Sequence, residues 1–242
     1  MLYEDLVFED GGLWAHFAWE YLPFKHGFST VLAGNMSMKF GERRKVTDNR
    51  ERFFRLLDHP QEKTIFINPQ HQDKILFLEK YPTIFYPECD GVITTVPGIG
   101  IALLPADCLP VILWGRIREQ DFIGLIHAGR KGTKLRIIEK AIELLVQKGG
   151  KTEEINVAIG PAIHSCCYRF AKVIKIDLIK ENIQQALNKE VSIANIIVAH
   201  TCTCCAKRSD GTPIFFSHRR AKEQKEKEGR FVAFVGLEKR AL

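Results

Sequence analysis

Long apolar runs are absent from this chain of 242 residues. No stretch approaches the roughly 20 apolar residues that a membrane-spanning helix requires. The N-terminal segment MLYEDLVFEDGG carries acidic side chains where a secretory signal peptide carries a basic residue followed by an apolar run. We therefore expect a cytoplasmic protein that does not act at a membrane.

Internal repeats are also absent, and so are linkers rich in Gly, Ser or Pro. The chain is long enough to bury a substantial core, and its 16 Phe residues supply bulky material for one. Because nothing in the sequence divides it, we expect a single domain over residues 1–242.

Charge of one sign is in small excess, with a formal net charge of +6. Much of the excess lies in residues 42–45 and 219–230. The second segment, RRAKEQKEKEGR, mixes basic and acidic side chains, which is more typical of a solvated face than of a nucleic-acid-binding patch. We therefore expect no nucleic-acid partner.

The seven cysteines lack the even number and regular spacing of a disulfide framework. In a reducing cytoplasm we expect them to remain thiols. Such cysteines are metal ligands, nucleophiles or core residues, and their surroundings in the sequence must distinguish these roles.

Apolar runs bounded by turn residues predict more strands than helices. The two kinds of element do not alternate strictly, which favours mixed sheets covered by helices over a doubly wound parallel fold. The predicted strands are 13–19, 64–67, 91–95, 101–104, 110–114, 122–126, 155–159, 196–199 and 230–236, and the predicted helices are 47–57, 133–148 and 174–187.

Three of the predicted strands adjoin a side chain that can bind a metal ion. His71 follows the strand in TIFINPQHQDK, Cys108 lies between two strands in GIALLPADCLPVILW, and His127 ends the strand in FIGLIHAGRKGT. Two imidazoles and one thiolate suit Zn²⁺ and leave a fourth coordination position open. Taken singly, each has a plainer interpretation as a hydrogen-bonded structural histidine or a small buried cysteine.

Five segments of the sequence, in this order, resemble the laccase-domain, or multicopper polyphenol oxidoreductase, family. They are HGFST at 26–30, DGVITTVPGIGIALLPADC at 90–108, HAGRKGT at 127–133, IGPAIHSCCY at 159–168 and FFSHRR at 215–220. The resemblance implies an α+β fold, a layered α/β sandwich with mixed β-sheets. It also implies that His71, Cys108 and His127 are the metal ligands and the catalytic centre.

Members of the family are understood as purine nucleoside phosphorylases. The resemblance thus implies a zinc enzyme that converts adenosine, inosine, guanosine or methylthioadenosine, with phosphate, to the base and ribose 1-phosphate. Adenosine deamination is a second expected activity. Copper is the alternative metal, because its affinity for such a site generally exceeds that of zinc.

The sequence departs from the family pattern at several positions. Pro69 stands where members usually have Gln, and Gln70 precedes His71. The usual HAGWRG appears as HAGRKG, so that Arg130 replaces Trp and Lys131 replaces the basic partner. The Arg-Gly-Gly that commonly follows HGFST is missing. The three expected metal ligands are unaffected by these changes.

The segment from Gly129 to Thr133 is expected to be a loop that opens onto the N-terminus of the predicted helix. Arg130 and Lys131 would then form an anion site with the free backbone N–H groups, suited to phosphate. The plainer interpretation is an ordinary strand–loop–helix turn with exposed basic residues.

Four further residues are candidates for contacts with substrate. Asn49 and Arg50 match an Asn-Arg pair of the family on the polar side of the first helix, where a surface ion pair is the alternative. Arg219 and Arg220 precede the last strand. The resemblance places this segment near the site, which implies that Arg219 or Arg220 holds phosphate or a ribose hydroxyl; the alternative is a salt-bridged strand entry.

The remaining cysteine clusters are expected to have no metal-binding role. Cys166 and Cys167 are adjacent, which hinders joint chelation of one ion and would strain a disulfide, so we expect buried packing residues at the edge of the site. Cys202 and Cys205 have CxxC spacing, with Cys204 between them. A single CxxC without a second pair is weak evidence for zinc, so we expect core residues.

Three other functions compete with phosphorolysis. Copper-dependent oxidation of phenols would need His-x-His pairs, and the eight histidines contain none. A cysteine hydrolase, related to peptidoglycan precursor editing, would use Cys108 and His127 as nucleophile and base. A non-catalytic binding module would fit the loss of the Trp at position 130.

Overall fold

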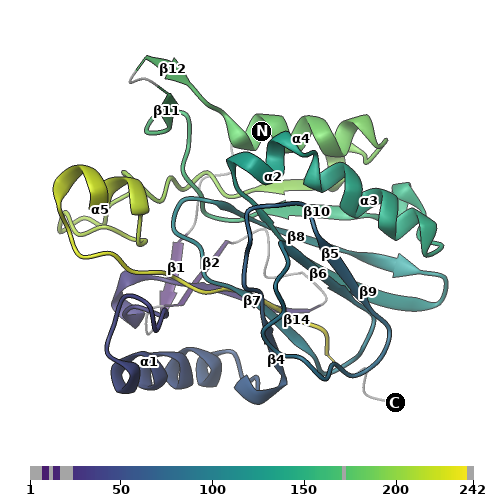
Figure 1. The fold of residues 1–242 in the computed structure, drawn as a ribbon, viewed down its shortest axis with the longest axis horizontal. Coiled ribbons are helices and arrows are strands. Elements are labelled where there is room, and N and C mark those ends of the chain that lie inside the picture. Colours follow the sequence, from purple (N-terminus) through teal and green to yellow (C-terminus); the bar gives the residue numbers. More distant parts are fainter. Residues whose placement is uncertain (1–6, 11–12, 17–23, 171–172, 239–242) are drawn as a thin grey trace.

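The computed structural model describes residues 7–10, 13–16, 24–170 and 173–238. Two mixed β-sheets lie face to face, with α1 (Arg43–Leu56) on the outer side of the first and α3 (Ile137–Gln147) and α4 (Leu178–Asn188) on the outer side of the second (Figure 1). The predicted α+β layered sandwich with mixed sheets is therefore confirmed.

The first sheet has the strand order β1-β2-β3-β14-β7-β4. Neighbours are antiparallel except β4, which runs parallel to β7. The strands are β1 (Val7–Asp10), β2 (Leu13–His16), β3 (Lys25–Ser29), β14 (Ala233–Gly236), β7 (Gly100–Leu103) and β4 (Thr64–Phe66).

The second sheet has the order β13-β10-β8-β9-β6-β5. Both edge strands, β13 and β5, are parallel to their neighbours, and the central four are antiparallel. The strands are β13 (Ile196–Val198), β10 (Asn156–Ile159), β8 (Leu109–Ile117), β9 (Gln120–Ala128), β6 (Gly91–Thr94) and β5 (Ile75–Leu78). The long β8–β9 hairpin forms its centre.

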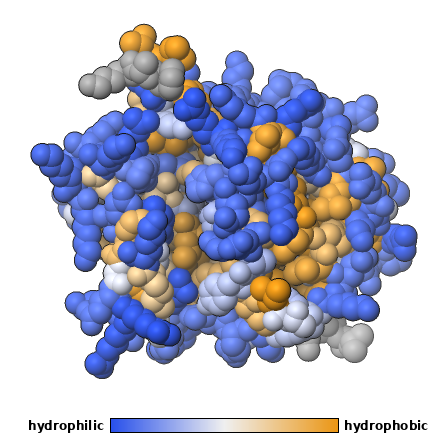
Figure 2. Space-filling view, viewed as in Figure 1, coloured by the Kyte–Doolittle hydropathy of each residue, from blue (hydrophilic) through white to orange (hydrophobic). Residues whose placement is uncertain are grey.

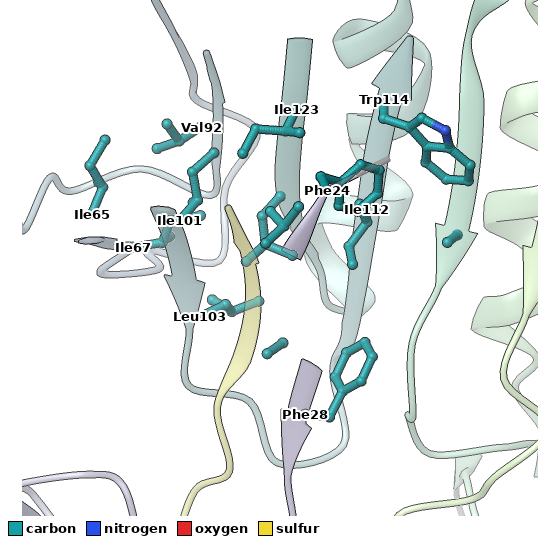
Figure 3. Close-up of a cluster of buried hydrophobic side chains, with 14 of the residues drawn as sticks. Phe24, Phe28, Ile65, Ile67, Val92, Ile101, Leu103, Ile112, Trp114 and Ile123 are labelled. Carbon is teal, nitrogen blue, oxygen red and sulfur yellow. The ribbon is translucent and has the colours of Figure 1, made fainter. Parts of the chain in front are cut away.

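Apolar side chains from both sheets form the core between them. Ile65, Ile101 and Leu103 of the first sheet meet Val92, Ile112 and Ile123 of the second in one buried cluster (Figure 3). Two further clusters lie on the outer faces of the sheets, a small one under α1 and one of similar size to the central cluster under α3 and α4. The two central sheets therefore share one core, which holds the ends of their strands in fixed positions.

Shorter elements connect these layers. They are α2 (Arg130–Lys134), α5 (His218–Gln224), the two-residue strands β11 (Arg169–Phe170) and β12 (Ile174–Lys175), and 3-10 turns at Val31–Ala33, Gln61–Lys63, Thr152–Glu154 and Ile193–Asn195. The surface seen in Figure 2 is mostly hydrophilic, with an apolar tip at β12, where Val173 and Ile174 are exposed.

Each of the nine predicted strands overlaps an observed one, and residues 17–19 of the first lie outside the described residues. The predicted last strand begins too early, because residues 230 and 231 bond to loops; Phe231, for example, donates its N–H to the carbonyl of Pro105, and the strand begins at Ala233. The sequence analysis missed the short strands β1, β3, β5, β11 and β12.

The helix predictions were wrong in detail. The first helix begins at Arg43, four residues earlier than predicted, and the hydroxyl of the interior residue Thr47 donates to the carbonyl of Arg43. The predicted helix 133–148 is two helices, separated at Arg136, whose φ of 60° is left-handed. The third begins at Leu178, after the strand β12.

Within the described residues, no helix combines the length and the apolar character needed to cross a membrane.

Candidate metal centre and adjoining pocket

His71, Cys108 and His127 meet at the ends of strands from both sheets. Their potential ligand atoms all lie within 4.8 Å of one another. His71 lies in the loop after β4, Cys108 immediately precedes β8, and His127 is near the end of β9, where it pairs with Pro110. The rings of His71 and His127 stand edge to face, with centroids 4.9 Å apart.

Asp90, which precedes β6, holds both histidines in place. Its Oδ1 accepts a hydrogen bond from Nδ1 of His127 at 2.9 Å and another from the backbone N–H of His71 at 2.9 Å. Its Oδ2 accepts from the backbone N–H groups of Gln70 and Gln72. This leaves Nε2 of His127 to face Cys108, the arrangement in which a carboxylate orients a metal-binding histidine.

The loop that carries His71 depends on these contacts, because its backbone is unusual. His71 has a φ of 55°, in the left-handed region that non-glycine residues rarely adopt. Hydrogen bonds from three backbone N–H groups to the buried carboxylate of Asp90 hold this conformation.

Cys108 and His127 each shift the pKa of the other. Burial opposes the Cys108 thiolate, but the charge of His127 and hydrogen bonds from His127 and His71 outweigh burial and lower the pKa of Cys108 to about 6. Burial likewise opposes the protonated form of His127, but Cys108 and Asp90 raise its pKa to about 9. In the absence of a metal the pair is therefore a thiolate and an imidazolium at neutral pH.

The space around the triad suits a metal ion. A side chain at Gly129 would place its Cβ 3.1 Å from Sγ of Cys108 and 3.3 Å from Cε1 of His127, a tight approach that glycine avoids. Two imidazoles and a thiolate are a complete set for a tetrahedral ion with one open position. His71 is exposed and His127 is buried, so the centre opens to solvent on the side of His71.

A pocket of about 510 Å³ adjoins the triad at Cys108. Its wall combines the cations Arg130, Arg219 and Lys222 with apolar and aromatic side chains; the other lining residues are Ala106, Asp107, Cys108, Ile163, Tyr168, Leu178, His218 and Glu223. The guanidinium of Arg219 lies over the ring of Tyr168, 5.5 Å from its centroid.

The structure separates the two cations that the sequence placed in one anion site. The expected loop is instead the first part of α2, which begins at Arg130. Arg130 lines the pocket, whereas Lys131, the next residue on this helix, is exposed and is not one of the lining residues.

Asn49, Arg50 and Arg220 are likewise not among the lining residues of the pocket. Asn49 donates to the carbonyl of Asn35, and the buried Arg50 donates to the carbonyl of Met36 and lies over the ring of Phe66. The expectation that Arg50 lies on the polar side of the helix is therefore wrong, because its side chain is buried.

Arg220 is also buried, and its guanidinium donates to the carbonyl groups of Thr203, Cys204 and Phe215. The segment around Arg219 and Arg220 begins α5 and does not enter a strand. Of the four further candidates for substrate contact, only Arg219 reaches the pocket.

Sequence reasoning missed Asp90, Asp107 and Tyr168. Asp107 has a φ of 88°, accepts from the hydroxyl of Thr203 at 2.8 Å and accepts from the backbone N–H of Arg219 at 2.7 Å. The signal for Asp90 and Asp107 was an acidic residue one or two positions before an apolar strand, in DGVIT and ADCLPVIL.

The expectation of buried packing was wrong for Cys166, which is exposed, and Cys205 is exposed as well. Cys202 is buried, as expected. The sulfur atoms of Cys166, Cys167, Cys202 and Cys205 lie within 4.8 Å of one another, although two turns remote in sequence supply them.

Comparison with known proteins gives consistent results. The sequence profile of the family described as multi-copper polyphenol oxidoreductase laccase matches residues 25–175 and 169–238. The purine nucleoside phosphorylase YlmD of Geobacillus stearothermophilus is 29% identical over 252 residues, covering 89% of this chain and 88% of that protein. A purine nucleoside phosphorylase of Mycobacterium tuberculosis is 23% identical over 80% of each chain.

Solved structures have the same fold. The crystal structure of YlmD from Geobacillus stearothermophilus matches with a TM-score of 0.82 and 26% identity, covering 98% of this chain and 100% of that one. The hypothetical protein YfiH of Bacillus licheniformis matches with a TM-score of 0.80 and 26% identity, covering 95% and 98%. On the evidence of the profile match, the chain belongs to the multi-copper polyphenol oxidoreductase laccase family.

Proposed function

We propose that this protein is a zinc-dependent purine nucleoside phosphorylase. The observation that carries the proposal is the position of the His71, Cys108 and His127 cluster at the edge of a pocket lined by Arg130 and Arg219. The substrates would be a purine nucleoside (adenosine, inosine, guanosine or methylthioadenosine) and phosphate. The products would be the free base and ribose 1-phosphate.

The zinc ligands would be a ring nitrogen of His71, Sγ of Cys108 and Nε2 of His127. When bound, zinc supplies a Lewis acid that polarises or orients a substrate group at the open position. Asp90 keeps the proton of His127 on Nδ1 and so leaves the lone pair of Nε2 free to bind the metal.

The pocket wall fits both substrates. The cations Arg130, Arg219 and Lys222 would hold the phosphate dianion, and guanidinium groups suit its oxygen atoms because they donate in pairs. Tyr168, Ile163 and Leu178 offer apolar surface for a purine. With both substrates held there, a phosphate oxygen would form the bond to C1′ of the ribose as the bond from C1′ to the purine breaks.

Product analysis tests this function. The metal-replete protein would be incubated with adenosine over a range of phosphate concentrations, and adenine, ribose 1-phosphate and inosine would be measured. We expect adenine and ribose 1-phosphate in equal amounts, at a rate that saturates with phosphate. Adenine released at an unchanged rate without phosphate would instead indicate hydrolysis, and inosine as the only product would indicate deamination.

A cysteine hydrolase is the second candidate, because one observation favours it. The thiolate of Cys108 beside His127, which is in turn held by Asp90, is also the arrangement of an activated nucleophile and its base. Metal content separates the two functions, since a thiolate bound to zinc is not free to attack a carbonyl. Rapid alkylation of Cys108 in zinc-replete protein would support the hydrolase.

A further inference from the structure

Two turns that are distant in sequence bring four cysteines together beside the pocket. Cys166 and Cys167 lie in the turn after His164, and Cys202 and Cys205 lie in the turn after β13. All four sulfur atoms are within 4.8 Å of one another. Sγ of Cys166 lies 3.7 Å from Sγ of Cys167 and 3.7 Å from Sγ of Cys205.

These distances match a metal site and not a disulfide. A disulfide requires sulfur atoms about 2.05 Å apart. Four thiolates bound to one tetrahedral zinc ion at about 2.3 Å have sulfur atoms about 3.8 Å from one another. The adjacent pair Cys166–Cys167 meets this spacing, so adjacency in the sequence does not prevent joint chelation here.

The backbone supports one of the sulfur atoms in the manner of a metal ligand. The N–H of His164 donates to Sγ of Cys202 at 3.5 Å. A hydrogen bond of this kind orients a metal ligand.

We propose that Cys166, Cys167, Cys202 and Cys205 bind a second zinc ion in a closed, structural site. Four thiolates around one zinc ion would leave no position for a substrate, which distinguishes this site from the open triad at Cys108. Soft thiolate ligands select zinc over the hard cations calcium and magnesium. The proposal does not rest on the proposed function, since it concerns different residues.

The second ion would stabilise one wall of the pocket. Tyr168 follows Cys167 directly and lines the pocket, as does Ile163. In the other turn, the hydroxyl of Thr203 donates to Asp107, the neighbour of Cys108, and its N–H donates to the carbonyl of Ala162. A zinc ion joining the two turns would therefore fix the wall that carries Tyr168 and the backbone beside Cys108.

Metal counting with matched variants tests the proposal. Protein purified with a thiol reductant and without added metal should contain close to two zinc ions per chain. Cys166→Ser should contain one, and Cys166 is chosen because it is exposed and its substitution leaves the core intact. Cys204→Ser is the control, because Cys204 lies between two of the ligands in sequence but outside the group, and it should retain both ions.

The variant His71→Ala/Cys108→Ala isolates the second site without altering it. It should retain one zinc ion, and X-ray absorption at the zinc edge should show four sulfur ligands at about 2.3 Å. One zinc ion per wild-type chain with no loss in Cys166→Ser would overturn the proposal. So would nitrogen or oxygen ligands in the double variant, or iron in place of zinc. None of these measurements uses nucleoside turnover. If the triad at Cys108 held no zinc, wild type should contain one ion and Cys166→Ser none, so the two proposals fail separately.

Discussion

Nδ1 of His127 lies 2.9 Å from Oδ1 of Asp90, and both side chains are almost completely buried. The same carboxylate accepts hydrogen bonds from backbone N–H groups of the loop that carries His71. One acid thus positions both histidines of the candidate metal centre. Its substitution should therefore weaken metal binding more than the substitution of a residue on the surface.

We expect Asp90→Asn to weaken metal binding by about 10- to 100-fold, the usual effect of losing a carboxylate that orients a histidine ligand. Competition with a chromophoric chelator would measure the affinity. Asp48→Asn, at an exposed position on α1, is the control and should leave the affinity unchanged. Equal affinities for Asp90→Asn and wild type would contradict the positioning role.

Metal binding should release one proton from the Cys108–His127 pair between about pH 6 and pH 9. In this window the metal-free pair holds a single proton, because the pKa of Cys108 is about 6 and that of His127 is about 9. The bound metal requires a thiolate and a neutral imidazole, so this proton must leave. The apparent affinity should fall about tenfold per unit of pH from 9 to 6 as a result.

Calorimetry in buffers of different ionisation enthalpy would count this proton. The stability of the metal-free protein should change little through this pair over the same window. The raised pKa of His127 contributes stability that is lost as pH rises from 6.5 through about 9, while the lowered pKa of Cys108 contributes stability that is lost as pH falls from 9 through about 6. The two slopes therefore cancel. A metal affinity independent of pH would contradict the assignment.

We expect Arg130→Ala to raise the KM for phosphate about tenfold, a loss of about 1.4 kcal/mol, because Arg130 lines the pocket. Lys131→Ala removes the same charge one residue later on α2, outside the lining, and should change this KM much less. Metal content should be unchanged in both variants. An equal effect of the two substitutions would mean that overall charge, and not the pocket, attracts phosphate.

Arg50→Ala should destabilise the protein by about 2 kcal/mol and leave KM unchanged. The substitution leaves the carbonyl of Met36 without its donor and removes the contact of the guanidinium with Phe66. Urea denaturation would measure the loss. Arg44→Ala on the exposed side of the same helix is the control. Normal stability with a raised KM would instead restore the interpretation that Arg50 contacts substrate.

Periodicity and turn residues were sufficient to predict much of the fold. The central strands of the second sheet, β8 and β9, contain continuous apolar runs, and their burial follows from residue type alone. The break at Arg136 was not visible, because the apolar stripe continues across it. The end of α2, just before this break, is held by α4: Asn182 donates to the hydroxyl of Thr133 and Gln185 donates to its carbonyl.

The sequence by itself determined the residue types that the chemistry needs and their location at strand ends, so His71, Cys108 and His127 were identified from motif and resemblance. Only the tertiary structure decided which other residues join them. Arg130 and Arg219 reach the pocket, while Lys131 and Arg220, their immediate neighbours, do not. Likewise, the four cysteines meet because β10 and β13 are parallel neighbours and the turns that follow them lie side by side. Adjacent residues on a helix point in different directions, and turns 35 or more residues apart meet only through sheet pairing, so neither result follows from the order of the amino acids.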